Sequence, residues 1–258
     1  MHAVEVVGLR KSYGRVQALR GLTFRVSRGE IYGLLGPNGA GKTTTLKILV
    51  GLLRPDSGTA RIMGVDVVRD RVRALSMVGY IPENPVCFQN LTLREFLEFV
   101  TALRGLDGRD VSEPMRAYLS AFDLEEKQDE LMGSLSRGMV QKALAIAAFL
   151  VRPKVLIMDE PMAGMDPEAQ RTFKEEVRRL CSEGAAAVMS SHILDTVERF
   201  CTRVGIIDRG TLVAEGDVGE LKKMAGPGGT LEDVFLRLVR EDEEGPDGGQ
   251  VPAQEPGR

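Results

Sequence analysis

The sequence predicts an α/β fold in which a parallel-sheet core carries an antiparallel β layer at its N-terminus and an α-helical insertion. The first thirty residues alternate apolar and polar side chains, as half-exposed antiparallel strands do. Residues 86–150 show apolar positions at helical spacing. Continuous apolar runs, typical of parallel strands covered on both faces, recur on either side of that segment. They lie at residues 31–35, 155–158, 185–189 and 204–207.

The overall composition fits one α/β domain with an insertion. The chain has 258 residues, of which 43% are hydrophobic and 28% charged, so it can bury a substantial core. No run approaches the roughly 18 consecutive apolar residues of a membrane-spanning helix, and we expect no direct membrane insertion. Three cysteines without metal-ligand spacing, beside only two histidines, indicate free thiols in a reducing cytoplasm rather than a zinc site.

Charge is distributed unevenly along the chain. The net charge is −3, but residues 241–258 hold six acidic residues and one arginine, so the rest carries +2. Such a near-neutral body gives no electrostatic reason to bind nucleic acid. The last eighteen residues are also rich in glycine and proline, which is typical of disorder. We predict one domain over residues 1–240, with a helical subdomain at about 86–150, and a disordered acidic tail over 241–258.

Turns and capping residues place the other elements. Turns at residues 13–14 and 28–29 divide the N-terminal layer into short strands. Thr92 and Glu95 have the spacing of a capping box, which opens the first helix of the insertion. The remaining expected elements are helices at 43–53, 115–122 and 138–151, turns at 54–58 and 208–210, and strands at 59–63 and 211–214.

A glycine-rich turn joins the strand at 31–35 to the helix at 43–53. It matches the pattern Gly-x4-Gly-Lys-[Ser/Thr], and in this position it can lay backbone N–H groups around a di- or triphosphate. Lys42 can neutralise phosphate oxygens, and the Thr43 hydroxyl can bind Mg²⁺. We predict that a nucleoside triphosphate is bound by Gly36, Pro37, Asn38, Gly39, Ala40, Gly41, Lys42, Thr43 and Thr44.

A pair of carboxylates follows the strand at 155–158. Asp159, at the carboxyl end of this strand, can hold Mg²⁺ through a water opposite Thr43. Glu160 can orient and polarise a water for attack on the γ-phosphate. Asp-Glu after a strand can also be a solvated turn, but its combination with the phosphate-binding loop favours the functional interpretation. We assign Asp159 to metal binding and Glu160 to catalysis.

With these motifs in place, the chain resembles the ATP-binding subunit of an ABC transporter over about residues 3–240. Residues 135–139, Leu-Ser-Arg-Gly-Met, resemble the signature Leu-Ser-Gly-Gly-Gln of that family, and Ser136 precedes Asp159 by 23 residues. Gly-Met-Asp at 164–166 corresponds to the family's loop after the magnesium motif, whose aspartate communicates across a dimer.

Two single residues also match the family. His192 lies 33 residues beyond Asp159, at the family's switch histidine, where it could bond the γ-phosphate and hold Glu160 in place. A histidine at a loop edge, without a role in the site, is the alternative. Tyr13 matches the aromatic residue that stacks on adenine, although an aromatic residue covering a sheet edge would give the same pattern.

The resemblance implies a head-to-tail dimer, because in this family the signature of one subunit faces the glycine-rich phosphate-binding loop (the P-loop, residues 36–44 here) of another. Ser136 and the N–H groups near Gly138 would then meet the nucleotide of a partner chain. An ordinary helix N-cap is the alternative role of Ser136. The resemblance further implies ATP and Mg²⁺ as cofactors, a homodimer or a heterodimer with a related ATPase, a membrane-spanning permease subunit as partner, and a cytoplasmic position at the inner face of the cell membrane.

Departures from the family pattern indicate an export group. Arg137, which could face the nucleotide or solvent, and Met139 replace a glycine and a glutamine of the signature. Glu83 stands where importers and many exporters carry glutamine, and it could reach Mg²⁺ or lie in a solvent-facing turn. These features and residues 230–236 resemble the ABC-2-type exporters, in which a separate membrane subunit forms the channel. Phe88 is a candidate contact for that subunit, or alternatively a local core residue.

The sequence therefore predicts a Mg²⁺-dependent ATPase that drives export through a membrane-spanning partner. A regulatory or weakly hydrolysing ATP-binding protein stays open because of Glu83, Arg137 and Met139, and an importer ATPase stays open as well. A chromosome-maintenance ATPase is rejected: it would carry a long coiled coil between P-loop and signature, but only 94 residues separate Lys42 from Ser136, without sustained heptads.

Overall fold

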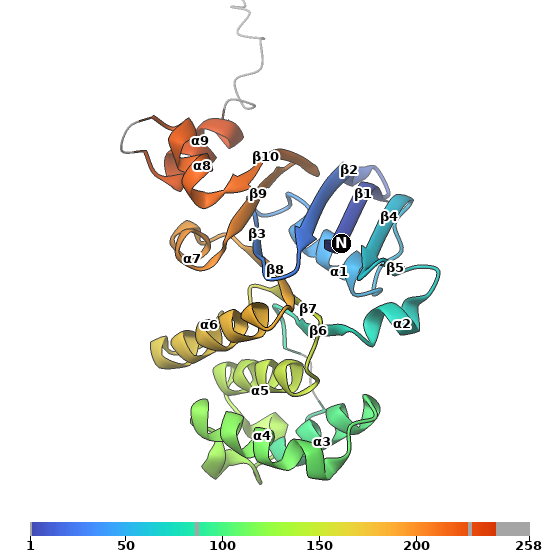
Figure 1. Cartoon of the computed structure of the whole chain (residues 1–258), viewed down its shortest axis with the longest axis vertical. Helices are drawn as coiled ribbons and strands as arrows, with labels where there is room; N and C mark the ends of the chain where they lie inside the picture. The colour runs from blue at the N-terminus through green and yellow to red at the C-terminus, as the bar shows by residue number, and fades with distance from the viewer. Residues whose placement is uncertain (1, 86–87, 227–228, 241–258) are drawn as a thin grey trace, which may run out of the picture.

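The computed structural model describes residues 2–85, 88–226 and 229–240 (Figure 1). Two sheets occupy the upper half of that view, and the helical insertion extends below them. The acidic tail that the sequence predicts at 241–258 lies outside the described residues.

The N-terminal layer is an antiparallel sheet with the strand order β2 (Val16–Ser27), β1 (His2–Tyr13), β4 (Ser57–Ile62), β5 (Val65–Asp66). β1 and β2 are longer than the short strands that the sequence predicts, because several register shifts let them stay paired along their whole length. Gly58 lies in β4 rather than in a turn. Its φ is +87° and a Cβ would lie 2.3 Å from the carbonyl oxygen of Gly8, so glycine lets the two strands approach.

The main sheet has the strand order β10 (Thr211–Asp217), β9 (Arg203–Asp208), β3 (Ile31–Leu35), β8 (Ala186–Ser191), β7 (Val155–Asp159), β6 (Val78–Ile81). β9, β3, β8, β7 and β6 run parallel, and β10 pairs antiparallel with β9. The continuous apolar runs predict these strands because both sheet faces are covered, and every residue of β3 and β7 is buried. β6 was not predicted, although its sequence Val-Gly-Tyr-Ile is as apolar as that of β3, which also contains a glycine.

The helices outside the insertion are α1 (Lys42–Leu49), α2 (Arg71–Leu75), α6 (Pro167–Ser182), α7 (Leu194–Phe200), α8 (Val218–Met224) and α9 (Leu231–Arg240). α1 is shorter than the predicted helix at 43–53, since Gly51 adopts a φ of +64° just beyond its end. α6 begins where the Asp166 carboxylate accepts a hydrogen bond from the N–H of Ala169 at 2.8 Å.

The insertion contains α3 (Leu93–Leu103), α4 (Gly108–Ala121) and α5 (Arg137–Leu150), with two 3-10 turns (Glu125–Lys127 and Met132–Ser134) between α4 and α5. The predicted capping box of α3 is confirmed: the N–H of Glu95 donates to Thr92 Oγ1 at 3.2 Å, and the N–H of Thr92 donates to Glu95 Oε2 at 2.8 Å. α4 begins earlier than the predicted residue 115, because Asp107 caps it by accepting from the N–H of Arg109.

Two hydrophobic cores lie on opposite faces of the main sheet. Leu156 and Met158 of β7 belong to the first, which we call the insertion-side core and which also contains buried residues of α3 to α9. Val155 and Ile157 belong to the second, the N-terminal core, which packs α1 and the antiparallel layer against the sheet. Alternation along β7 divides the two cores because successive strand residues point to opposite faces.

Three parallel strands end at one edge of the main sheet. Leu35 is in register with Ser191, and Asp159 is in register with Ser190. The chain segments that follow β3, β7 and β8 therefore converge beside the start of α1, and the predicted residues of the phosphate-binding loop, Asp159, Glu160 and His192 lie there.

Candidate functional site

The loop between β3 and α1 is packed so closely that two of its glycines, Gly36 and Gly41, leave no room for a side chain. A Cβ on Gly36 would lie 2.2 Å from the carbonyl oxygen of Ile207, and a Cβ on Gly41 would lie 2.7 Å from that of Ala18. Gly41 also adopts a φ of +108°. The loop thus lies against β9 and the start of β2, in the strand–loop–helix arrangement that binds phosphate groups.

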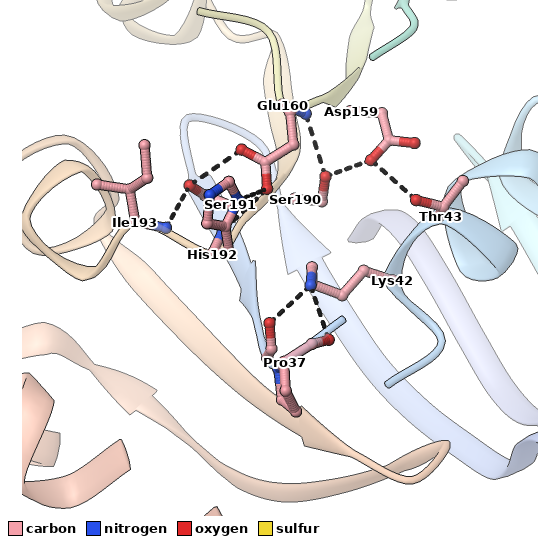
Figure 2. Close-up of polar contacts among 10 residues, drawn as sticks. Pro37, Lys42, Thr43, Asp159, Glu160, Ser190, Ser191, His192 and Ile193 are labelled. Carbon is pink, nitrogen blue, oxygen red and sulfur yellow. Dashed lines mark hydrogen bonds and ion pairs between the residues drawn. The ribbon is translucent and has the colours of Figure 1, made fainter. Parts of the chain in front are cut away.

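Lys42 is held inside this loop. Its ammonium group donates to the carbonyl oxygens of Gly36 at 2.6 Å and Pro37 at 3.0 Å, as Figure 2 shows. Burial lowers the pKa of Lys42, while the nearby carboxylates of Glu160, Asp159 and Glu83 act in the opposite direction. The side chain is 7% exposed and oriented by backbone acceptors, so its position is fixed before any phosphate binds.

Asp159 and Thr43 meet across the site. The Thr43 hydroxyl donates to Asp159 Oδ1 at 3.2 Å, and the Ser190 hydroxyl donates to the same oxygen at 2.5 Å (Figure 2). A hydroxyl and a carboxylate are the hard oxygen ligands that Mg²⁺ prefers. The described residues contain no group of three His, Cys, Asp or Glu suited to a metal, but Mg²⁺ beside phosphates needs only one or two carboxylates. The residues present therefore fit a Mg²⁺–nucleotide complex.

Glu160 is held in one orientation by β8 and the residues that follow it. His192 Nδ1 lies 2.7 Å from Glu160 Oε1, and the backbone N–H of His192 donates to the same oxygen at 2.9 Å (Figure 2). Ser191 Oγ reaches Glu160 Oε2 at 3.4 Å. Glu160 also has a φ of +44°, a left-handed conformation that residues with a Cβ rarely adopt. Strained backbone of this kind is often found at functional sites.

These side chains line a single pocket of about 390 Å³. It unites most of the predicted P-loop residues with the predicted metal and catalytic residues, and its outer wall includes Val16 and Ala18 of β2. The predicted site residues along its lining are Asn38, Gly39, Gly41, Lys42, Thr43, Thr44, Glu83, Asp159, Glu160 and His192.

Six predicted site residues do not line this pocket: Gly36, Pro37 and Ala40 of the phosphate-binding loop, and Tyr13, Ser136 and Gly138. Tyr13 pairs with Val16 at the hairpin between β1 and β2 and is 50% exposed, so adenine stacking stays a prediction. Ser136 caps α5, since its hydroxyl accepts from the N–H of Met139 at 3.3 Å. Ser136 and the adjacent Arg137 are exposed, whereas Gly138 is half-buried, and a Cβ on Gly138 would lie 2.4 Å from the carbonyl oxygen of Gly164.

The loop after β7 is attached to α5. Lys142 Nζ forms an ion pair with Asp166 Oδ2 at 2.7 Å, and this contact lowers the pKa of Asp166. Gln141 Nε2 donates to the carbonyl oxygens of Pro82 at 3.3 Å and Pro161 at 3.1 Å. Since Pro82 precedes Glu83 and Pro161 follows Glu160, this buried amide links two sides of the site to α5.

Sequence reasoning missed Gln141 and Ser190. The Ser190 hydroxyl accepts from the N–H of Glu160 at 3.2 Å while it donates to Asp159. Gln141 and Ser190 are both polar residues within apolar, buried segments, and that mismatch is the signal by which the sequence could have indicated them.

Phe88 is 57% exposed and packs edge-on against Phe99, with ring centroids 5.2 Å apart, so it is not a core residue.

None of the helices in the described ranges combines the length and the apolar character that crossing a bilayer requires.

Comparison with known proteins gives relatives along nearly the whole chain. A family model described as "ABC transporter" matches residues 19–163. The ABC-type transporter ATP-binding protein EcsA of Bacillus subtilis is 35% identical over 243 residues, covering 94% of this chain and 98% of that protein. The Nod factor export ATP-binding protein I of Ralstonia nicotianae is 37% identical over 218 residues, covering 84% and 68%. The probable multidrug ABC transporter ATP-binding protein YbhF of Escherichia coli is 34% identical over 92% of this chain, which spans 42% of that relative's length.

Solved structures agree with the fold described above. A structure of an ATP-binding subunit of an ABC transporter matches with a TM-score of 0.87 at 34% identity, covering 92% of this chain and 99% of that one. A nucleotide-free ATP-binding cassette from an ABC transporter matches with a TM-score of 0.75 at 22% identity, covering 90% and 98%. The chain therefore belongs to the family of ABC transporter ATP-binding proteins.

Proposed function

We propose that this chain hydrolyses ATP with Mg²⁺ and thereby drives export through a separate membrane-spanning partner. One observation carries the proposal: a single pocket unites Lys42 and Thr43 with the carboxylates of Asp159 and Glu160 and with His192. The names of two relatives, a Nod factor export protein and a daunorubicin resistance protein, support export as the direction of transport.

Each side chain has a role that its geometry supports. Lys42 would bind β- and γ-phosphate oxygens, exchanging its loop carbonyl partners for phosphate. Thr43 and Asp159 would hold Mg²⁺, with Glu83 within the same pocket, and bound Mg²⁺ would neutralise phosphate charge as the γ-phosphate leaves. Glu160 would position the attacking water, and its bond to His192 Nδ1 leaves His192 Nε2 free to approach the γ-phosphate.

The active form is proposed to be a head-to-tail dimer, made of two copies or of one copy and a related ATPase. Ser136 lies outside its own chain's nucleotide pocket, exposed at the N-terminus of α5. There the positive end of the helix dipole is available to the nucleotide of a facing subunit. Together with the permease, such a dimer would lie at the inner face of the cell membrane, on its cytoplasmic side.

Replacing the carboxylate of Glu160 tests the proposal. The variant Glu160→Gln keeps the volume and a hydrogen-bonding group but loses the charge that polarises water. We expect ATP binding to be retained, ATP-dependent dimers to accumulate in light scattering, and phosphate release to fall by about 10²–10³-fold. Glu175→Gln, on the exposed face of α6, is the matched control and should hydrolyse ATP normally. Near-normal turnover by Glu160→Gln would remove Glu160 from the mechanism.

The position of Glu83 favours a second candidate, a weakly hydrolysing regulatory protein. Glu83 adds a third carboxylate to a pocket that already contains Asp159 and Glu160, and negative charge there opposes the phosphates. Phosphate release measured with and without the membrane partner separates the candidates. Turnover that stays near background in both conditions, and rises in Glu83→Gln, would favour the regulatory protein.

A further inference from the structure

The described residues also form a larger cavity, of about 630 Å³, which shares no lining residue with the nucleotide pocket. It lies where β7 and β8 begin, at the opposite end of these strands from Asp159 and Ser191. It is half open to solvent and is bordered by the C-terminal ends of α5 and α6 and by one side of α4, and Figure 1 shows these helices stacked below the main sheet. Its lining includes Arg28, Tyr118, Phe149, Arg152, Lys154 and Arg179.

Positive charge in this cavity is not neutralised by the protein. Arg28, Arg152 and Lys154 are exposed residues at its rim, and their side chains have no hydrogen-bond or ion-pair partner among the described residues. Arg179 differs, because it is paired with Glu176 at 2.7 Å and with Glu183 at 2.5 Å. The acidic residue of the lining, Glu183, is thus already occupied, and the three free cations remain available to an anion.

Arg152 occupies a backbone position that normally favours glycine. It follows the last turn of α5 with a φ of +47°, and its N–H donates to the carbonyl oxygen of Phe149 at 2.9 Å. This left-handed geometry after a helix end is one that glycine adopts without steric cost. The backbone alone therefore gives no reason for an arginine at this position, whereas a role for its guanidinium group in the cavity does.

The wall between the cations is aromatic and apolar. The rings of Tyr118 and Phe149 lie with their centroids 5.9 Å apart, and Leu150, Pro153 and Leu180 complete the lining. The Tyr118 hydroxyl is fixed by Glu176 at 2.5 Å. A cavity of this size is within the range of about 300–1,000 Å³ that small-molecule sites occupy. Its chemistry fits a ligand with a planar apolar body and a doubly charged anionic group.

We propose that this cavity binds a small organic phosphate, with the phosphate group between Arg152, Arg28 and Lys154 and the organic part against Tyr118 and Phe149. Guanidinium groups bind phosphate through paired, charge-assisted hydrogen bonds, and the lysine ammonium adds a point charge. The site does not depend on the nucleotide pocket and is proposed in addition to ATP hydrolysis.

Calorimetric titration of phenyl phosphate into the full chain tests the proposal. Lys42→Ala serves as the parent, because it removes the P-loop ammonium group from competition and makes the result independent of ATP hydrolysis. We expect one saturable site per chain, and about tenfold or greater weakening in the added variants Arg152→Gly and Lys154→Ala. Phenol, which lacks the anionic group, should not bind.

Matched controls separate this site from general effects of charge or folding. Arg69→Ala removes the same charge from an exposed position outside the cavity and should leave the Kd unchanged. Arg152→Gly relieves the left-handed backbone, so its thermal midpoint should equal or exceed that of the parent even as binding weakens. No saturable binding to the parent, equal binding of phenol, or the same Kd in Arg152→Gly and Lys154→Ala as in the parent would overturn the proposal.

Discussion

The Ser190 hydroxyl connects two acidic residues of the neighbouring strand. It donates to Asp159 Oδ1 at 2.5 Å and accepts from the N–H of Glu160 at 3.2 Å, and it is fully buried. Without it, Asp159 would keep, among the described residues, the side-chain hydrogen bond from Thr43, and the partly buried N–H of Glu160 would lose its acceptor.

Removing this hydroxyl should slow hydrolysis more than it weakens nucleotide binding. Because Ser190 orients Asp159 and Glu160 without lining the nucleotide pocket itself, we expect Ser190→Ala to lower kcat by about 10–100-fold, as loss of supporting contacts does at metal sites. Steady-state kinetics with varied ATP and Mg²⁺ measures this effect. Ser182→Ala, at the exposed end of α6, is the control. A kcat unchanged from that of the control would limit Ser190 to a packing role.

Two buried thiols give a pH-dependent prediction. Burial raises the pKa of both Cys181 and Cys201 to about 12. An unfolded thiol ionises near pH 8.5, so above that pH the folded state retains protons that the unfolded state loses, and the free energy of unfolding should fall as pH rises towards 12.

Iodoacetamide labelling checks the state of these thiols. Because iodoacetamide reacts with the thiolate, we expect Cys181 and Cys201 to stay unlabelled in the native protein at pH 8 and to react quickly in denaturant. Peptide mapping by mass spectrometry distinguishes them from Cys87. Rapid native labelling of Cys201 would contradict its burial.

At the scale of elements, α5 and the loop that follows β7 behave as one unit. Gly138 lies against Gly164, and Lys142 forms an ion pair with Asp166. The first contact brings backbone against backbone and leaves no room for a methyl group, while the ion pair lies one helical turn further along α5.

Adding a methyl group at Gly138 tests this close approach. In Gly138→Ala the Cβ would meet the carbonyl oxygen of Gly164 at 2.4 Å, so α5 or the loop must move. We expect a loss of about 1–3 kcal/mol in the free energy of unfolding, together with slower ATP hydrolysis. Gly219→Ala in α8 meets no atom within 4 Å and should instead stabilise by about 0.5–1 kcal/mol. Urea titration compares the two, and equal stability would contradict the close contact.

The sequence predicts elements best where one local signal is strong. Strand 155–158 and the capping box at Thr92 follow from burial pattern and capping chemistry, and both are confirmed. Element ends were predicted less well. α4 begins directly after its N-cap Asp107, a residue that the apolar spacing does not reveal. The amphipathic helix α6 was not predicted, although Asp166 followed by a proline is an ordinary signal for the start of a helix.

The candidate site shows the same division. Lys42, Thr43 and Asp159 could be predicted because phosphate and Mg²⁺ chemistry restricts both residue type and spacing. Ser190 and Gln141 could not, since their partners are far apart in sequence and only the strand register and helix packing bring them together.

At the scale of the whole molecule, the last helix of the described chain, α9, packs into the insertion-side core. Leu231 and Val234 of α9 are almost fully buried in that core. The composition of residues 241–258, by contrast, offers little apolar surface to bury; these residues lie outside the described ranges, and their predicted disorder stays a prediction.

Two truncations test this boundary. A chain ending at residue 240 should unfold at the same temperature as the full chain and hydrolyse ATP at the same rate. A chain ending at residue 229 loses Leu231 and Val234, and we expect it to be destabilised by at least about 2–5 kcal/mol. Thermal unfolding followed by circular dichroism measures both. A lower midpoint for the chain ending at residue 240 would show that the acidic tail contributes to the fold.

The insertion-side core binds the helical subdomain and the nucleotide-binding sheet into one cooperative structure. Leu156 and Met158 of β7 belong to this core together with buried residues of α3 to α9. A miniaturised protein made by cutting out residues 86–150 would lose α3, α4 and α5 from this core and expose part of the apolar face that they cover, which favours aggregation. Engineers seeking a minimal ATP-binding module from this chain would first have to make that face polar.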